Sequence, residues 1–365
     1  MTYTSSIDAF WGVLRVAIGR ESLSKIAFDK RLWPEIYDIA RRQGLIGILY
    51  QVVRKLPETM RPERTLWLQW TMSADWIKQQ SQKADRAVAK VFVALRRDGY
   101  CALLLKGQGL SRLYPAPESR LSGDIDVWLY GNRRQIIDYV RRERPTCLPV
   151  YHHVDALIDG VSSVEVHFTP TWMYHYTTNR RLQRFFSEVA EAQFAPAKSV
   201  QIGGEEVAIP TATFNSVYLL VHLYRHWFDE GIGLRQLVDY YYVLCDRQAL
   251  DLQVFLLWIK RLRLTRFLGA VCYVLHHWFG MTIEELPIAP DEVFGKQLME
   301  GILASGNLGK FVLGGAVARQ PNRMKRAWVR LRRNMTFVYA YPSEALAAPF
   351  FKLWHYLWRK WYRWT

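Results

Sequence analysis

Residues 103–129 read LLLKGQGLSRLYPAPESRLSGDIDVWL and hold two carboxylates two positions apart, Asp124 and Asp126, among apolar residues. Successive side chains of a β-strand point to opposite faces, so these carboxylates are expected to share one face while Ile125 and Val127 enter a core. Two negative charges that close are unfavourable unless a cation lies between them. Mg²⁺ is commonly held by one or two carboxylates together with substrate phosphates. The stretch therefore predicts a divalent-cation site on a strand.

A later strand is expected to supply a third acid. Residues 161–168 (VSSVEVHF) alternate in the β-branched pattern of a strand, which puts Glu165 and His167 on one face. If this strand pairs beside that of Asp126, Glu165 completes a three-carboxylate cluster. Upstream, a predicted strand over residues 100–105 ends in the turn KGQG, whose glycines let the backbone approach a ligand closely.

This order of elements resembles the nucleotidyltransferase superfamily of the polymerase-β type. Residues 104–129 are similar to a large bacterial group within it that carries a Lys-Gly turn, a Tyr-Pro pair, an Arg and then Gly-Asp-Ile-Asp. Residues 214–239 (FNSVYLLVHLYRHWFDEGIGLRQLVD) resemble that group's helical segment with His-x3-His, a glycine-rich turn and Arg-x3-Asp. Many superfamily members have Gly-Ser at the turn, where this chain has Gly107-Gln108, and the spacing from Gly107 to Asp124 is longer than in compact members.

The resemblance implies transfer of a nucleoside monophosphate from an NTP, ATP among them, with Mg²⁺ or Mn²⁺. Asp124 and Asp126 would hold the ions, and Glu165 would complete the acceptor-side site or act as general base. The turn would offer backbone N–H groups to phosphates, helped by the positive N-terminal end of the helix after it. Lys106 and Arg120 are candidate phosphate ligands. The simpler alternative for Lys106 is a solvated strand end. For Arg120 it is a salt bridge that orders the carboxylate loop, which is the loop that leads to Asp124. The nucleotide-binding residues expected in this region are Lys106, Gly107, Gln108, Gly109 and Arg120.

Two histidines four residues apart on a predicted helix, His222 and His226, share a face and could ligate a metal. A role in packing or hydrogen bonding is equally open, and no third ligand is evident in the sequence nearby. The resemblance implies instead that they line the cleft opposite the carboxylates and contact nucleotide or acceptor, together with Arg235 and Asp239.

Composition bounds the class of protein. The chain has 365 residues, half of them hydrophobic, and a formal charge of +16 that points to an anionic partner such as a nucleotide, RNA or lipid headgroup. Its four cysteines form no CxxC pair, which suits a reducing cytosol. The N-terminal sequence lacks the basic-then-apolar order of a signal peptide, and no apolar run reaches the roughly 18 residues of a membrane span. We therefore expect a cytoplasmic protein.

The chain divides by pattern into four parts. Residues 1–98 read as helical, residues 99–210 as the catalytic core, and residues 211–321 as a second helical region. The expected fold class is α/β (α+β), a small mixed sheet flanked by helical regions. In the core, His152 and His153 fall in a predicted strand over residues 150–158, where neighbours point to opposite faces, so a chelating pair is not expected.

The fourth part, residues 322–365, is a basic aromatic tail. Residues 322–333 (NRMKRAWVRLRR) are densely basic, and residues 349–365 (PFFKLWHYLWRKWYRWT) place large apolar side chains on one helical face. This pattern fits a helix docked on its own core with a basic outer face, a helix in a membrane interface, or a nucleic-acid contact. A peripheral position at the membrane therefore stays open.

The sequence favours a transferase of phosphorus-containing groups that moves a nucleoside monophosphate to a hydroxyl or phosphate of a small molecule or sugar. A tRNA- or protein-modifying enzyme of the toxin or defence kind is the second hypothesis. A non-catalytic scaffold that binds nucleotide or a membrane surface is the third.

Overall fold

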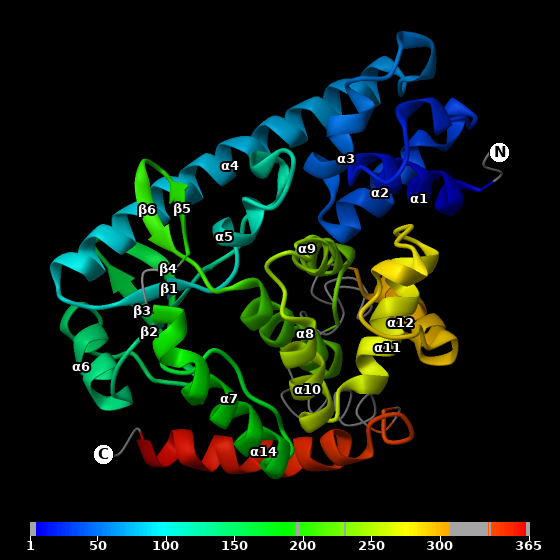
Figure 1. The fold of residues 1–365 in the computed structure, drawn as a ribbon. Helices are drawn as coiled ribbons and strands as arrows, with labels where there is room; N and C mark the ends of the chain where they lie inside the picture. Colours follow the sequence, from blue (N-terminus) through cyan, green and yellow to red (C-terminus); the bar gives the residue numbers. More distant parts are fainter. Residues whose placement is uncertain (1–4, 195–197, 230, 307–334, 336, 363–365) are drawn as a thin grey trace.

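The computed structural model describes residues 5–194, 198–229, 231–306, 335 and 337–362. A small mixed sheet and a separate hairpin are flanked by helices, which confirms the expected α/β architecture (Figure 1). The strands are β1 (Ala102–Leu104), β2 (Ile125–Leu129), β3 (His153–Ile158), β4 (Val161–His167), β5 (Ser199–Ile202) and β6 (Glu205–Ala208). The α-helices are α1 (Ser6–Ala17), α2 (Trp33–Gln43), α3 (Ile46–Val53), α4 (Arg64–Arg97), α5 (Gln108–Ser111), α6 (Arg133–Glu143), α7 (Tyr176–Phe194), α8 (Ala212–Asp229), α9 (Leu234–Cys245), α10 (Leu252–Arg261), α11 (Thr265–His277), α12 (Glu292–Ser305) and α14 (Pro342–Tyr362).

The sheet has the strand order β1-β2-β4-β3. β2 is parallel to β4 and antiparallel to β1, and β3 is antiparallel to β4. One face is apolar: Ile125 and Val127 of β2 join Val164 and Val166 of β4 in a buried cluster with α4 and α6. Since strand side chains alternate, the intervening residues of β2 and β4 face the other way, toward α8 and α9. The polar face of the sheet therefore lies toward α8 and α9, and the apolar face lies on α4 and α6.

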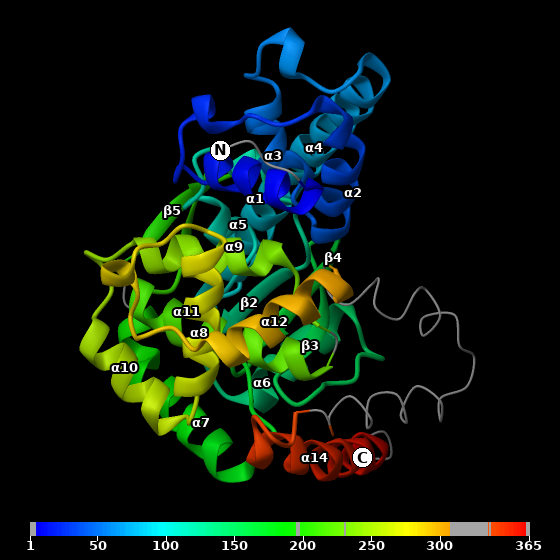
Figure 2. The same cartoon turned by 90° about the vertical axis from the view of Figure 1, so that its right-hand side faces the viewer.

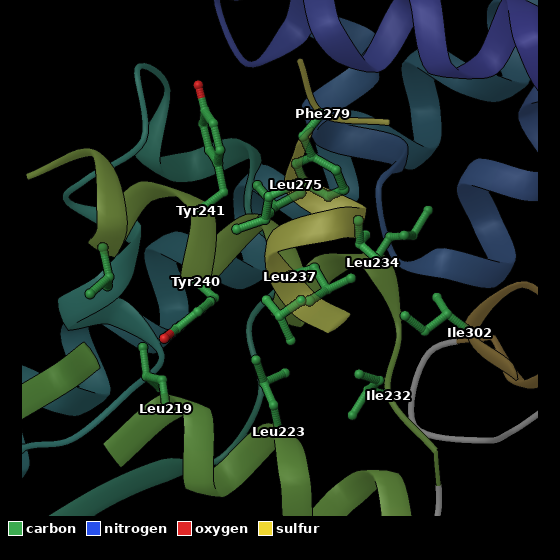
Figure 3. Close-up of a cluster of buried hydrophobic side chains, with 14 of the residues drawn as sticks. Leu219, Leu223, Ile232, Leu234, Leu237, Tyr240, Tyr241, Leu275, Phe279 and Ile302 are labelled. Atoms are coloured by element: carbon green, nitrogen blue, oxygen red, sulfur yellow. The ribbon is translucent and has the colours of Figure 1, made fainter. Parts of the chain in front are cut away.

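The N-terminal and C-terminal helices share one large core. Trp11 of α1 contacts Trp278 beyond the end of α11, and the buried Gln43 side chain donates to the Ile302 carbonyl and accepts from the Leu234 N–H. Figure 3 shows the centre of this core, where leucines of α8 and α9 meet side chains of α11 and α12. The long helix α4 joins both parts of the protein, because its first half packs in this core and its second half packs under the sheet.

The tail helix α14 is docked on the core, one of the three alternatives left open by the sequence. Glu344 accepts hydrogen bonds from the backbone N–H groups of Tyr174 and His175, and Lys352 Nζ lies 2.8 Å from Asp229 Oδ1. The expected basic outer face is wrong: Lys352 faces inward, while the outward face is apolar. The basic segment 322–333 lies outside the described residues. No helix in the described part of the chain is long and apolar enough to cross a membrane.

Candidate active site

The polar face of the sheet brings together side chains from β2 and β4. Asp126 lies directly opposite Glu165 in the parallel register, and His167 follows two residues later on the same face. Asp126 is buried, whereas Asp124 precedes the first residue of β2 and is exposed at the cleft. Partial desolvation by the walls of the cleft, with the charges of Glu165 and Asp126, raises the pKa of Asp124 above its ordinary value although the residue is exposed at the cleft mouth. The three predicted carboxylates therefore line one cleft, although Asp124 lies at its mouth.

Lys106 comes from the turn after β1 and reaches the carboxylates. Its Nζ lies 2.9 Å from Asp126 Oδ1 and 3.4 Å from His222 Nε2. Burial alone would raise the pKa of Asp126, but the Lys106 charge and a hydrogen bond from His167 outweigh it and hold that pKa below its usual range. Burial lowers the pKa of His222 well below its usual value, so the neutral ring accepts from the ammonium group, which has no acceptor of its own. Lys106 is thus an ordered cation inside the cleft and not a solvated strand end.

A row of imidazoles continues from the carboxylates. His167 Nε2 lies 3.2 Å from Asp126 Oδ1 and 3.6 Å from Glu165 Oε2, and His153 Nδ1 lies 3.5 Å from the same Glu165 oxygen. His152 Nε2 and His153 Nδ1 are 3.0 Å apart. Burial lowers the pKa of His153 to about 4, so its approach to Glu165 is not an ion pair at neutral pH.

The expectation that His152 and His153 diverge is wrong. β3 begins at His153, and His152 lies in the bend before it, where the alternation of a strand does not apply. The two rings contact each other, with centroids 4.3 Å apart, and both lie near His167. The sequence signal for this contact was the pair of adjacent histidines. The bend at His152 brings the two rings together, and the sequence pattern did not predict that bend.

Among the described residues, three overlapping groups of donor atoms are compact enough for a metal ion, one of them formed by His153, Asp155 and Glu165. One ligand atom each from Asp126, Glu165 and His167 lie within 4.8 Å of one another, and so do those of His152, His153 and His167. Carboxylate oxygens suit Mg²⁺ and Mn²⁺, and imidazole nitrogens suit first-row transition metals. The donor set therefore fits a divalent cation.

The opposite wall of the cleft is basic and comes from α8 and α9. It carries His222, His226 and Arg235, and also Arg225, which sequence reasoning missed although it lies between the two histidines. The Arg225 guanidinium lies over the Trp172 ring, 3.0 Å from its centroid. Burial, together with the charge of Arg120, lowers the pKa of Arg235 to about 10. The acidic and basic walls enclose a cavity of about 500 Å³.

Arg120 and Asp239 form a buried ion pair with each other. Arg120 Nε and Nη2 lie 2.7 and 2.8 Å from the two Asp239 oxygens, and the Tyr114 hydroxyl donates to Oδ1 at 2.6 Å. Burial alone would lower the pKa of Arg120, but Asp239 raises it above its ordinary value. The bidentate pair ties the carboxylate loop to α9, which is the simpler of the two alternatives for Arg120. Both residues still border the cavity.

The glycine turn is divided between the cleft and the core. Gly107, at a φ of 59°, lines the cleft beside Lys106. The Gln108 side chain instead donates to Ser81 and Asp85 of α4, and the Gly109 N–H donates to the Lys106 carbonyl. The helix after the turn, α5, has four residues, so it offers less dipole than the sequence led us to expect.

Comparison with known protein families agrees with this geometry. The sequence model of a family described as uncharacterised nucleotidyltransferase matches residues 29–280, more than half of the chain. The chain belongs to this family. The matched region contains both walls of the cleft, and the protein is accordingly a transferase of phosphorus-containing groups. No curated protein and no solved structure matches the chain.

Proposed function

We propose that this nucleotidyltransferase moves a nucleoside monophosphate from an NTP, ATP among them, to a hydroxyl or phosphate of a small molecule or sugar, with Mg²⁺ or Mn²⁺. One observation carries the proposal. Carboxylates on β2 and β4 face cations on α8 and α9 across a single cavity of about 500 Å³. A nucleotide needs both walls, since its phosphates require cations and its metal ions require carboxylates.

Asp124, Asp126 and Glu165 are the proposed metal ligands, and His167 offers a nitrogen donor beside them. A bound divalent ion would neutralise phosphate charge and lower the pKa of an acceptor hydroxyl. Burial alone would raise the pKa of Glu165, but the hydrogen bond with His167 outweighs it and lowers that pKa. A carboxylate that is ionised at neutral pH and weakly basic suits a metal ligand better than a general base.

The basic wall is proposed to bind the phosphates. Arg235 donates from Nη1 to the Leu121 carbonyl at 2.7 Å, while its buried Nε has no hydrogen-bond partner within the described chain. A buried N–H without a partner costs free energy, which a phosphate oxygen would recover. Lys106, Arg225, His222 and His226 add donors along the same cavity. In our proposal Gln108 supports nucleotide binding indirectly, because its side chain fixes the glycine turn to α4. Arg120 and Asp239 also act indirectly, because their ion pair positions the carboxylate loop.

The cavity supports a small acceptor. Small-molecule and cofactor sites commonly enclose roughly 300–1,000 Å³, so a cavity of about 500 Å³ supports a small acceptor rather than a large one. The formal charge of +16 supports RNA as an alternative acceptor, and a protein is the other. The four free cysteines support a place in the cytoplasm.

The test is transfer of label from each α-labelled NTP in host extract separated into small molecules, RNA and protein, with Mg²⁺ or Mn²⁺. Asp126→Asn removes one charge from the acidic wall, and Asp138→Asn makes the same change at an exposed position of α6. We expect label in the small-molecule fraction for the wild type and Asp138→Asn, and at least a hundredfold less for Asp126→Asn. Label in RNA or protein would change the acceptor class. Equal transfer by Asp126→Asn would refute the metal assignment.

A further inference from the structure

The outward face of α14 carries large apolar side chains that the rest of the described protein does not cover. Their exposed fractions run from 48% at Trp354 to 76% at Phe350. The spacing of three and four residues puts them in one stripe along the helix. Monomeric proteins rarely expose contiguous apolar patches larger than a few hundred Å² unless the patch has a partner. This outward stripe consists of Phe350, Leu353, Trp354, Leu357 and Trp361.

The exposure belongs to a helix that is firmly docked through its other side. Ala345 and Ala348 are buried against the core, and Phe351 contacts the rings of Tyr151, Trp172 and Tyr174. Both views place α14 along the end of the molecule opposite α1–α3 (Figure 1, Figure 2). The stripe is therefore held facing outward by a fixed helix.

Charge selects among the partners that could cover the stripe. The one acidic residue of α14 is Glu344, which is buried and accepts two backbone N–H groups. Lys360 is exposed and borders the stripe near its C-terminal end, whereas Arg359 follows Lys352 by two turns on the other side of the helix. A second copy would bring two positive faces together in a chain whose formal charge is +16, whereas an anionic surface would be attracted. Tryptophan and tyrosine beside arginine and lysine are typical of helices in the headgroup region of a bilayer.

We propose that α14 binds the surface of an anionic lipid bilayer, with the outward stripe in the headgroup–acyl boundary and Lys360 at the lipid phosphates. This goes beyond nucleotidyl transfer and does not depend on it. His355 of the same helix lines the active-site cavity, so a bilayer bound to α14 would lie close to the cleft.

Sedimentation of the full-length protein with vesicles tests the proposal, using phosphatidylcholine alone or with about 30% phosphatidylglycerol. Leu353→Glu with Leu357→Glu puts two charges in the stripe, and Leu68→Glu with Met72→Glu makes the same change at an exposed i, i+4 pair of α4. Arg359→Ala with Lys360→Ala removes two charges from the last turn of α14, and Arg54→Ala with Lys55→Ala removes two exposed charges at the end of α3. Thermal melts of all variants establish that they fold.

We expect the wild type to sediment with anionic vesicles. Its affinity for vesicles of pure phosphatidylcholine should be lower by at least about tenfold. The Leu353/Leu357 variant should lose about tenfold or more in affinity, the Arg359/Lys360 variant should bind more weakly with a flatter salt dependence, and both controls should match the wild type. Three results would overturn the proposal. They are equal binding by the stripe variants, a wild-type dimer that the Leu353/Leu357 change dissociates without any vesicle binding, and RNA binding that needs Arg359 and Lys360 in a protein that ignores vesicles.

Discussion

Asp126 of β2 and Glu165 of β4 lie directly opposite each other on neighbouring parallel strands. Parallel neighbours need a crossover connection, here α6 and β3, so topology and not closeness in sequence brings the two carboxylates together. His167 shares their face, and its Nε2 lies within 3.6 Å of an oxygen from each. Any cation held by the pair would therefore meet an imidazole nitrogen as well.

This nitrogen predicts a preference for Mn²⁺ over Mg²⁺. Mg²⁺ takes oxygen ligands, whereas imidazole binds first-row transition metals well. We expect His167→Gln to weaken Mn²⁺ binding about tenfold or more and to leave Mg²⁺ binding little changed. Electron paramagnetic resonance of free Mn²⁺, with and without competing Mg²⁺, measures this in NTP-free protein. His277→Gln on α11, outside the cavity, is the control, and a loss of the same size for both ions would contradict the prediction.

The face that carries the acids could be predicted because strand periodicity is local. In residues 125–127 and 164–166 apolar and acidic side chains alternate, and the apolar ones needed a core, which α4 and α6 supply. The other contacts of the site depend on distant partners. Gln108 turns to Ser81 and Asp85 because α4 passes beneath the turn, and His152 meets His153 because of a bend. In the same way, the sequence could not predict that Lys352 faces the core, because its partner Asp229 lies on the distant helix α8.

Removing either partner of the Arg120–Asp239 pair should destabilise the protein. Each single change leaves an uncompensated buried charge, so we expect Arg120→Met or Asp239→Leu to cost about 3–5 kcal/mol in the free energy of unfolding. The double variant should recover most of this and lose only the hydrogen bond of Tyr114. Urea melts of the four proteins form a double-mutant cycle. Additive losses would show that the two side chains do not act as a pair, and would reopen a phosphate-binding role for Arg120.

Arg235 should behave in the opposite way. Within the described chain its guanidinium has one hydrogen bond, to the Leu121 carbonyl, and its Nε is buried without a partner at the cavity. A charged hydrogen bond to phosphate contributes about 1.5–3 kcal/mol, so Arg235→Gln should raise KM for the NTP about ten- to hundredfold. Its melting temperature should change little. Steady-state kinetics beside Arg134→Gln, an exposed arginine of α6, measures this; an unchanged KM would place the phosphates elsewhere in the cavity.

Glu344 should make the docking of α14 sensitive to pH. Burial, the largest cause, raises the pKa of this carboxyl from 4.5 to about 7, despite the backbone N–H groups of Tyr174 and His175 that favour its ionised form. The folded-state pKa of Glu344 lies above its unfolded value. The contribution of the protonated carboxyl to the free energy of unfolding is therefore fully present below about pH 4.5 and is lost as pH rises toward 7. Glu344→Gln keeps one acceptor oxygen and cannot ionise, so its stability should not fall over this range. Relative to the Glu344→Gln variant, the free energy of unfolding of the wild type should fall by up to about 3 kcal/mol between pH 4.5 and pH 8.

Urea melts of both proteins at several pH values, with Glu300→Gln on α12 as the exposed control, measure that difference. Parallel stability curves for the wild type and Glu344→Gln would show that the buried carboxyl titrates normally. The expected curves diverge above pH 5, because only the wild type must then bury a charge where α14 meets the segment before α7.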